Sequence, residues 1–192
     1  MTFALFAGLA AGLLHVFSGP DHLAAIAPLA IDGDRRGWRT GLQWGYGHTA
    51  GVLLIATLLL LLKEQLPLDA ISAYSERIVG LSLIAVGGWG IWKATRRNTT
   101  PHSHAGASFV MGTIHGLAGS SHLFAVLPAL AFSARIDAFL YLAAFGVGAL
   151  AGMTAFAAGV GRIVIRFGHF RGILYASSAA ALVIGGVWLV GR

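Results

Sequence analysis

The sequence contains no cysteine and few charged residues. Only 10% of its 192 residues are Asp, Glu, Lys or Arg, whereas soluble domains carry about 25%. The absence of cysteine excludes disulfide exchange, thiolate metal ligands and iron–sulfur clusters. The shortage of charge comes with 57% hydrophobic residues and a mean hydropathy of +0.78. Together these values exclude an ordinary soluble domain and predict an integral membrane protein.

The net charge of +6 does not indicate a nucleic-acid partner. The basic residues lie in short segments between apolar stretches, where they orient helices in a lipid bilayer. The first apolar stretch has no basic segment before it, so we expect it to be retained as a helix and not cleaved as a signal peptide. The expected partners are therefore the bilayer and a small substrate, and the sequence also allows assembly of several copies.

Six stretches are apolar and long enough to cross a membrane, which takes about 20 residues. We expect an all-α integral membrane protein with six transmembrane helices over residues 2–31, 39–62, 74–95, 106–133, 136–160 and 171–191. Gly19-Pro20 in the first stretch and Gly119-Ser120-Ser121 in the fourth predict broken or kinked helices.

A histidine-bearing segment occurs twice. Gly12 to Pro28 matches Gly112 to Pro128, which pairs the histidines of the two copies: His15 with His115 and His22 with His122. Ionisable residues at membrane depth are costly to bury, so matched pairs of them indicate a functional site.

The repeat continues beyond these segments. Residues 45–51 align with 146–152, and residues 83–88 align with 181–186. Each half is then a three-helix unit, and an odd number of spans inverts the second unit relative to the first. We expect one membrane domain with a first repeat at 1–98, a central cytoplasmic loop at 99–105 and a second, inverted repeat at 106–192.

The basic residues support the odd number of spans. Three of the expected loops fall on one side of the membrane and carry nine of the thirteen Lys and Arg residues: Arg35, Arg36, Arg39, Lys93, Arg96, Arg97, Arg162, Arg166 and Arg171. Because cytoplasmic loops are enriched in Lys and Arg, both termini are expected outside the cytoplasm, in a bacterial inner (plasma) membrane.

The candidate metal ligands are His15, Asp21, His22, His48, His115 and His122. The two histidines of each pair are seven residues apart, which is about 10 Å along an ideal helix and too far for one ion. A helix break between them would shorten this distance. Asp21 would favour a cation beside it, because a lone carboxylate in lipid otherwise takes up a proton. Imidazoles and a carboxylate without thiolate suit nickel, cobalt or zinc better than calcium or magnesium.

Structural roles for the same residues stay open. The four repeated histidines also suit hydrogen bonding between helices, Asp21 suits a cap at a kink, and His48 suits packing, since its counterpart is Ala149. His102 and His104, in the central loop, suit either metal collection or simple solvation. The tryptophans are interpreted as an aromatic belt near the span ends and are assigned no chemistry.

The residues His15-Val-Phe-Ser-Gly-Pro-Asp21-His22 resemble the first-helix signature of the NicO-type nickel/cobalt permeases, in which a histidine precedes an Asp-His pair. Four residues usually separate them there, and five do so here. They are also similar to the hydrogenase- and urease-accessory nickel permeases, which share the five-residue spacing. The wider group is the lysine-exporter superfamily, built from inverted three-helix repeats. The resemblance is specific over residues 12–28. It implies a six-helix carrier of Ni²⁺ or Co²⁺ with His15, Asp21 and His22 as ligands.

The expected function is therefore transport of a divalent transition-metal ion, Ni²⁺ or Co²⁺ before Zn²⁺, by alternating access around a midplane site, with no cofactor beyond the transported ion. The alternatives are a carrier of an amino acid or small anion on the same scaffold, a membrane-embedded metalloenzyme and an accessory subunit. The metalloenzyme is disfavoured, because Asp21 would have to serve as both ligand and base, and the protein is not expected to be an enzyme.

Overall fold

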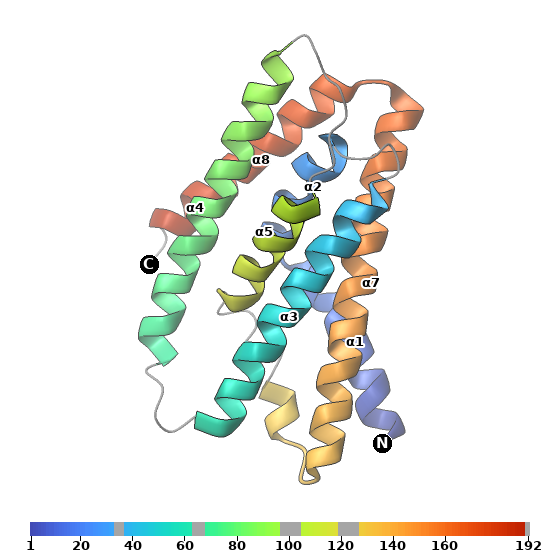
Figure 1. Ribbon diagram of the computed structural model, residues 1–192, viewed down its shortest axis with the longest axis vertical. Helices are drawn as coiled ribbons and strands as arrows, with labels where there is room; N and C mark the ends of the chain where they lie inside the picture. Colours follow the sequence, from blue (N-terminus) through green and yellow to red (C-terminus); the bar gives the residue numbers. More distant parts are fainter. Residues whose placement is uncertain (33–36, 63–67, 97–104, 119–126, 191–192) are drawn as a thin grey trace.

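The computed structural model describes residues 1–32, 37–62, 68–96, 105–118 and 127–190, and for 59–62, 68–73 and 105 the backbone alone. These residues are almost entirely helical, and none of them lies in a β-strand (Figure 1). The helices are α1 (Thr2–Ser18), α2 (Pro20–Asp32), α3 (Trp38–Leu62), α4 (Leu68–Thr95), α5 (Ala105–Leu117), α7 (Arg135–Phe167) and α8 (Phe170–Val190). The all-α prediction is confirmed.

Within the described ranges, three helical segments are long and apolar enough to cross a membrane: Tyr74–Thr95, Arg135–Phe167 and Phe170–Val190. The bent pair α1–α2 adds a fourth when it is counted as one span. All six expected stretches coincide with helix, although the fourth is described only as α5 and a short helical turn over 127–130. Six complete spans therefore remain a prediction.

The first stretch is broken at Gly19, as predicted, and its two halves are bent by 73°. Gly19 is extended, with φ −90° and ψ 97°, and its N–H donates to the carbonyl oxygen of His15 at 3.1 Å. Pro20 disfavours helical backbone at the residue before it, and it suits the first position of the next helix because it lacks an N–H. One Gly-Pro step thus ends α1 and starts α2.

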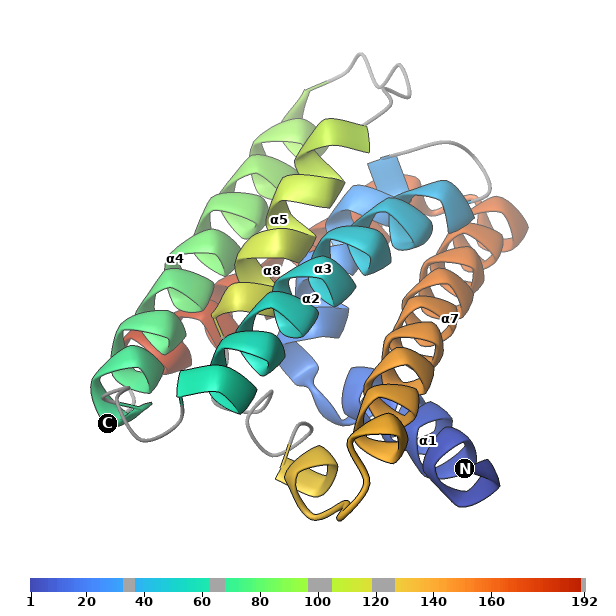
Figure 2. The same ribbon diagram turned by 60° about the horizontal axis from the view of Figure 1, so that its bottom comes forward.

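The helices form a bundle in which partners distant in sequence lie side by side. α1 packs along α7, α3 along both α5 and α7, and α4 along α8 (Figures 1 and 2). α2 runs between these pairs and contacts α3, α4, α7 and α8. The histidine-bearing segments of α1, α2, α3 and α5 therefore converge in the interior.

Several described basic residues lie towards one end of the bundle. The ends of α2, α4 and α7 and the starts of α3 and α8 meet there (Figure 1). Lys93 Nζ lies 3.3 Å from the Oδ2 atom of Asp32, and both side chains are buried. The Nε–H of Arg171 donates to the carbonyl oxygen of Ala94 at 2.9 Å. These two contacts join α2, α4 and α8, so the ends of the expected basic loops do lie on one side.

Glycines bring the backbones of the paired helices into contact. A Cβ atom at Gly12 would overlap the carbonyl oxygen of Phe145, and one at Gly112 would overlap that of Trp44. In the predicted repeat these contacts are equivalents, because Trp44 and Phe145 occupy matching positions. The reciprocal contacts match as well: a Cβ at Gly47 would overlap the carbonyl oxygen of Phe109, and one at Gly148 that of Leu9.

The same match holds for the third helix of each half. A Cβ at Gly87 would lie 2.7 Å from the carbonyl oxygen of Ser178, and one at Gly185 would lie 2.8 Å from that of Gly80. The predicted repeat pairs Gly87 with Gly185, and the same offset pairs Gly80 with Ser178. These glycine contacts between α1 and α7, α5 and α3, and α4 and α8 therefore correspond under the predicted pairing of the two halves.

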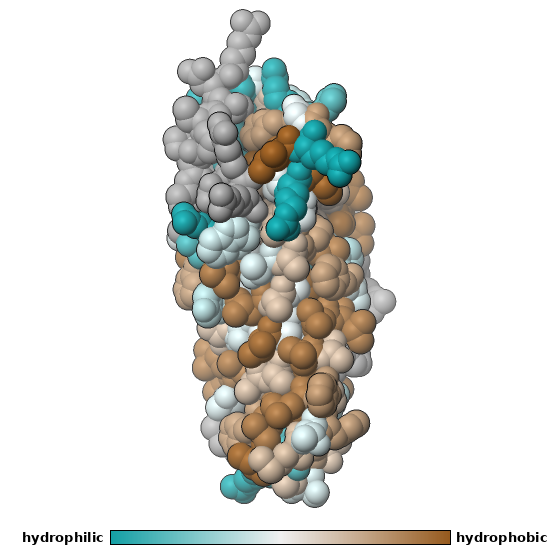
Figure 3. All heavy atoms as spheres, turned by 90° about the vertical axis from the view of Figure 1, so that its right-hand side faces the viewer, coloured by the Kyte–Doolittle hydropathy of each residue, from teal (hydrophilic) through white to brown (hydrophobic). Residues whose placement is uncertain are grey.

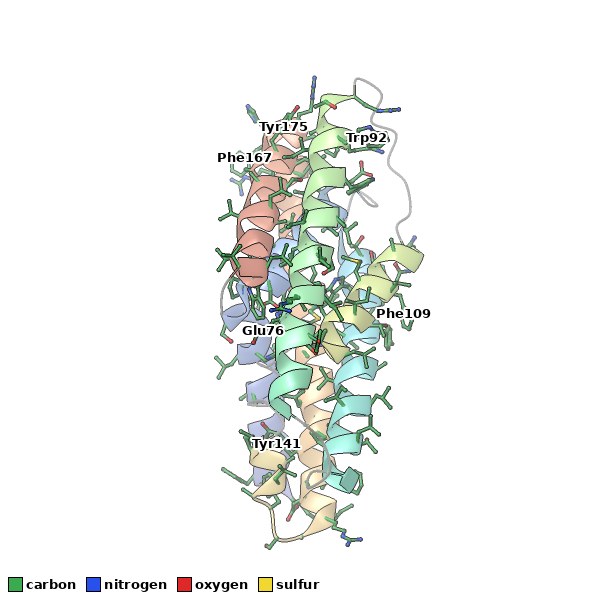
Figure 4. The ribbon with its side chains drawn as sticks, turned by 90° about the vertical axis from the view of Figure 1, so that its left-hand side faces the viewer. Glu76, Trp92, Phe109, Tyr141, Phe167 and Tyr175 are labelled. Atoms are coloured by element: carbon green, nitrogen blue, oxygen red, sulfur yellow. The ribbon has the colours of Figure 1, made fainter. Side chains whose placement is uncertain are left out.

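The surface suits lipid over most of its length. Apolar residues cover the face shown in Figure 3, and hydrophilic residues gather towards its ends. Trp92, Phe167 and Tyr175 lie near one end (Figure 4) and are 49%, 59% and 37% exposed. The guanidinium of Arg96 lies 3.9 Å from the ring centre of Trp92. An aromatic ring paired with a basic residue at a bundle end is typical of a membrane interface.

Candidate metal centre

Four helices bring their histidines to one place. His15 lies in the last turn of α1 and His22 in the first turn of α2, on opposite sides of the Gly19 break. His48 comes from the middle of α3, and His115 from the last turn of α5. The break turns a separation of two helical turns into direct contact, since the rings of His15 and His22 are 4.7 Å apart between centres.

Three of these imidazoles form a cluster with the dimensions of a metal site. His15, His22 and His48 each offer one ring nitrogen, and these atoms all lie within 4.8 Å of one another. The Nε2 atoms of His22 and His48 are 3.0 Å apart. The ring of His15 is 5.4 Å from that of His48 between centres. Small shifts could therefore bring all three nitrogens to the distance of about 2 Å that metal–imidazole bonds require.

Asp21 orients His22. Its Oδ1 atom lies 3.0 Å from the Nδ1 atom of His22, and both residues are buried. An ionised carboxylate only accepts hydrogen bonds, so Nδ1 carries the proton and Nε2 carries the lone pair. Histidines that bind metals commonly donate their other N–H to a carboxylate in this way. The sequence predicted Asp21 as a ligand, whereas the structure brings it to the site through His22.

His115 is oriented by its own helix. Its Nδ1 atom lies 3.0 Å from the carbonyl oxygen of Met111, which accepts the hydrogen bond. The lone pair then belongs to Nε2. The ring centre of His115 is 6.3 Å from that of His22. His115 thus lies beside the three-histidine cluster, at a greater distance from His22 than His15 and His48.

The whole site is shielded from solvent. His22 and His48 are fully buried, and His115, Asp21 and His15 are 1%, 5% and 8% exposed. Neutral histidines hydrogen-bonded to one another account for such burial without a charged ion. A divalent cation suits the same site, because the imidazole lone pairs and the negative charge of Asp21 replace its hydration.

Trp44 is a part of this site that the sequence interpretation missed. Its indole is fully buried and contacts the rings of His48, His115 and His22, with centres 5.3, 5.2 and 5.7 Å away. The interpretation of all tryptophans as an aromatic belt is wrong for this residue. The spacing of four residues from His48 was the available signal, since residues i and i+4 share a helix face.

Other predicted residues lie elsewhere or outside the described part of the chain. His122, Ser120 and Ser121 fall in residues 119–126, and His102 and His104 in 97–104, all outside the described ranges. His169 is exposed, and its Nδ1 atom lies 2.6 Å from the carbonyl oxygen of Phe167. It lies at the α7–α8 connection and not with the clustered histidines.

Fold and site together define a helical protein with membrane-spanning candidates and a buried cluster of histidines. Over 89 residues the chain is 47% identical to "Chloroplast protein FOR GROWTH AND FERTILITY 2" of Arabidopsis thaliana and 45% identical to "Chloroplast protein FOR GROWTH AND FERTILITY 1" of the same plant. Each match covers 46% of this chain and 24% of the plant protein. The chain thus matches about a quarter of the length of these relatives.

A third relative is a bacterial protein. The chain is 29% identical over 101 residues to "Urease accessory protein UreH" of Bacillus sp. (strain TB-90), which is 51% of this chain and 42% of that protein. No protein-family model matches the chain, and no solved structure matches it either.

Proposed function

We propose that this protein is a membrane transporter of divalent transition-metal ions, with Ni²⁺ or Co²⁺ as its cargo. The observation that carries the proposal is the cluster of His15, His22 and His48, whose ring nitrogens lie within 4.8 Å of one another in the interior. Imidazole sites without thiolate suit first-row ions such as nickel, cobalt and zinc. Ionisable residues at such depth in a membrane protein commonly mark a substrate path.

Each residue of the site has a distinct proposed role. His15, His22 and His48 ligate the ion, and Asp21 orients His22 while adding negative charge. His115 moves inward to complete the ligand set, since its Nε2 atom already carries the lone pair. His122, the repeat counterpart of His22, is proposed as a further ligand from the sequence alone. No reaction is assigned to the site, because Asp21 is engaged with His22 and a metalloenzyme would need a separate base.

The proposed architecture is six spans in two inverted three-helix repeats. The matched glycine contacts support it, because Gly12 meets the Phe145 carbonyl as Gly112 meets that of Trp44. Alternating access would then come from rocking one unit against the other around the fixed site. Small residues at such interfaces let the helix backbones approach closely.

One of the relatives favours the metal proposal. The match to a urease accessory protein agrees with the resemblance of residues 15–22 to urease-accessory nickel permeases. The plant relatives are named for a chloroplast location and for growth and fertility, so their names specify no cargo. We propose a bacterial inner-membrane location with the basic end inside, because Lys and Arg residues such as Lys93 and Arg171 are enriched on the cytoplasmic side of membrane proteins.

Uptake of radiolabelled nickel and cobalt tests the proposal directly. Cells producing the wild type should change their metal content, and cells producing His22→Ala or His48→Ala should not. His169→Ala is the matched control, because His169 is exposed at the α7–α8 connection. Equal accumulation in all variants would remove the proposal.

Binding measurements separate the cargo classes. The purified protein should melt at a higher temperature with nickel or cobalt, because a ligand that binds only the folded state stabilises it. If none of nickel, cobalt and zinc shifts the melting temperature, the carrier of an amino acid or small anion becomes the better explanation.

A further inference from the structure

Trp44 contacts the rings of three buried histidines. The indole is nearly parallel to the ring of His48, at 15°, and meets those of His115 and His22 at 52° and 64°. These three rings come from α3, α5 and α2. A Cβ atom at Gly112 would overlap the Trp44 carbonyl oxygen, so α5 fixes the backbone at this position. Trp44 therefore holds imidazoles from three helices in place.

The predicted repeat provides an internal comparison for this role. Phe145 is the counterpart of Trp44, and its ring lies 5.4 Å from that of His15, the counterpart of His115. The two aromatic residues cover the two equivalent histidines at nearly the same distance, 5.4 Å against 5.2 Å. A phenyl ring is thus sufficient for covering a histidine. The presence of tryptophan at position 44, where the counterpart is phenylalanine, then calls for a property that a phenyl ring lacks.

Besides its second ring, the indole has an N–H group that a phenyl ring lacks. Among the described residues, no group accepts a hydrogen bond from Trp44 Nε1, although this atom is buried. A buried donor without an acceptor costs about 1–3 kcal/mol. Buried tryptophans usually find a partner for this group. The site that surrounds Trp44 is the one proposed to receive an ion, and an ion can bring its own acceptor.

We propose that Trp44 is a specificity-determining residue whose indole N–H donates to a water molecule that the bound ion retains. The proposal rests on the function proposed above. Ni²⁺ with nitrogen and oxygen ligands favours square-planar or tetragonal sets, and a tetragonal shell has more positions than four imidazoles fill. Zn²⁺ is usually four-coordinate and tetrahedral, so four imidazoles fill its shell and leave no place for a retained water. Trp44 therefore favours the hydrated ion, nickel, over zinc.

The repeat also explains why only one half carries the donor. His48 stacks on Trp44 and follows it by four residues in the chain. In the second half, the residue four positions after Phe145 is Ala149, the counterpart of His48. The metal ligand and the indole thus occur together in the first half and are both missing from the second. This pairing is expected if the N–H serves the ion and not the packing of helices.

Calorimetric titration of the detergent-purified protein with nickel and with zinc tests the proposal. Trp44→Phe copies the residue found at position 145, so it removes the N–H and keeps an aromatic cover. Trp92→Phe is the matched control, because Trp92 is half exposed and contacts Arg96. Losing one hydrogen bond should weaken nickel binding about three- to tenfold. Zinc binding should change less than about twofold, and Trp92→Phe should change neither.

A second variant keeps the proposal testable if Trp44→Phe folds poorly. Benzothienylalanine at position 44 replaces the indole N–H with sulfur and preserves the ring shape, and it should show the same loss of nickel selectivity. An unchanged nickel-to-zinc affinity ratio in either folded variant would overturn the role of Trp44 and leave the transport proposal standing. A wild type that binds neither ion would overturn both.

Discussion

His22 Nδ1 lies 3.0 Å from Oδ1 of Asp21, the residue directly before it in the chain. Adjacent residues seldom face one another on a helix, and here they do so where α2 begins, immediately after the Gly19 break. The contact fixes which nitrogen of His22 carries its proton and directs the lone pair of Nε2 towards His48. Asp21 therefore orients one imidazole of the histidine cluster.

Replacing Asp21 should weaken metal binding without removing it. Asp21→Asn keeps an oxygen acceptor but loses the negative charge, and changes behind metal ligands typically cost 10–100-fold in affinity. We expect about a tenfold weaker affinity for nickel by calorimetry in Asp21→Asn, and a larger loss in Asp21→Ala. Asp137→Asn, near the start of α7, is the control. Wild-type affinity in Asp21→Ala would contradict the orienting role.

The three clustered histidines should contribute more to nickel binding than His115, which lies farther from the cluster. His22→Ala, His48→Ala and His15→Ala each remove a member of the cluster and should lose more than the 10–100-fold typical of residues behind the ligands. His115 lies farther from His22, at 6.3 Å between ring centres, so His115→Ala should lose less. Nickel affinities of the purified variants give this order. A His115 variant weaker than the other three would show that the cluster is centred elsewhere.

Glycine substitutions at the matched interfaces should destabilise the bundle equally. In Gly12→Ala and Gly112→Ala the new methyl group would overlap a backbone carbonyl oxygen, of Phe145 and of Trp44 respectively. Overpacking of this kind costs about 1–3 kcal/mol, so both variants should melt at lower temperatures in detergent. A Cβ at Gly88 would meet nothing within 4 Å. Gly88→Ala should be neutral or stabilising, because alanine is the better helix former.

The buried ion pair at the basic end should show strong coupling. Lys93 Nζ lies 3.3 Å from Asp32 Oδ2, with side chains 9% and 1% exposed. Removing one partner of a buried pair costs about 3–5 kcal/mol, because the other charge is left uncompensated. Asp32→Asn and Lys93→Met should each lower the melting temperature more than the double variant does. Additive losses in the double variant would mean that the two groups do not interact.

The orientation of the basic end can be measured by labelling, because the chain has no cysteine to remove. Gly172→Cys lies at the start of α8 on the basic end, and Ser133→Cys lies before the start of α7; both positions are exposed. In intact bacterial cells a membrane-impermeant maleimide should label Ser133→Cys and not Gly172→Cys. The reverse pattern would invert the proposed orientation.

The sequence predicted the helices well, because apolar stretches with basic ends specify them directly. It also located the break, since Gly19-Pro20 disfavours continuous helix. It placed the end of the fifth stretch too early, at residue 160, whereas α7 continues to Phe167. Gly168 ends this helix in the left-handed conformation, with φ 65°. Gly159 and Gly161 lie inside this helix, and glycine is common inside membrane helices.

Contacts between helices were harder to predict. The position of Trp44 among three imidazoles depends on how α2, α3 and α5 approach one another, and one sequence contains no direct signal for that. Asp32 and Lys93 are 61 positions apart by their numbering, and only the packing of α2 on α4 brings them together. The repeat stays a prediction, and the glycine contacts of the two halves agree with the residue pairs that it proposes.

The break at Gly19 also has an electrostatic consequence. A helix carries partial negative charge at its C-terminal end and partial positive charge at its N-terminal end. The end of α1, with His15 in its last turn, attracts a cation, whereas the start of α2 repels one. Asp21 is the only acidic residue in the first turn of α2 and lies at that repelling end. Its carboxylate therefore cancels the helix charge beside His22, and both sides of the break become attractive to a positive ion.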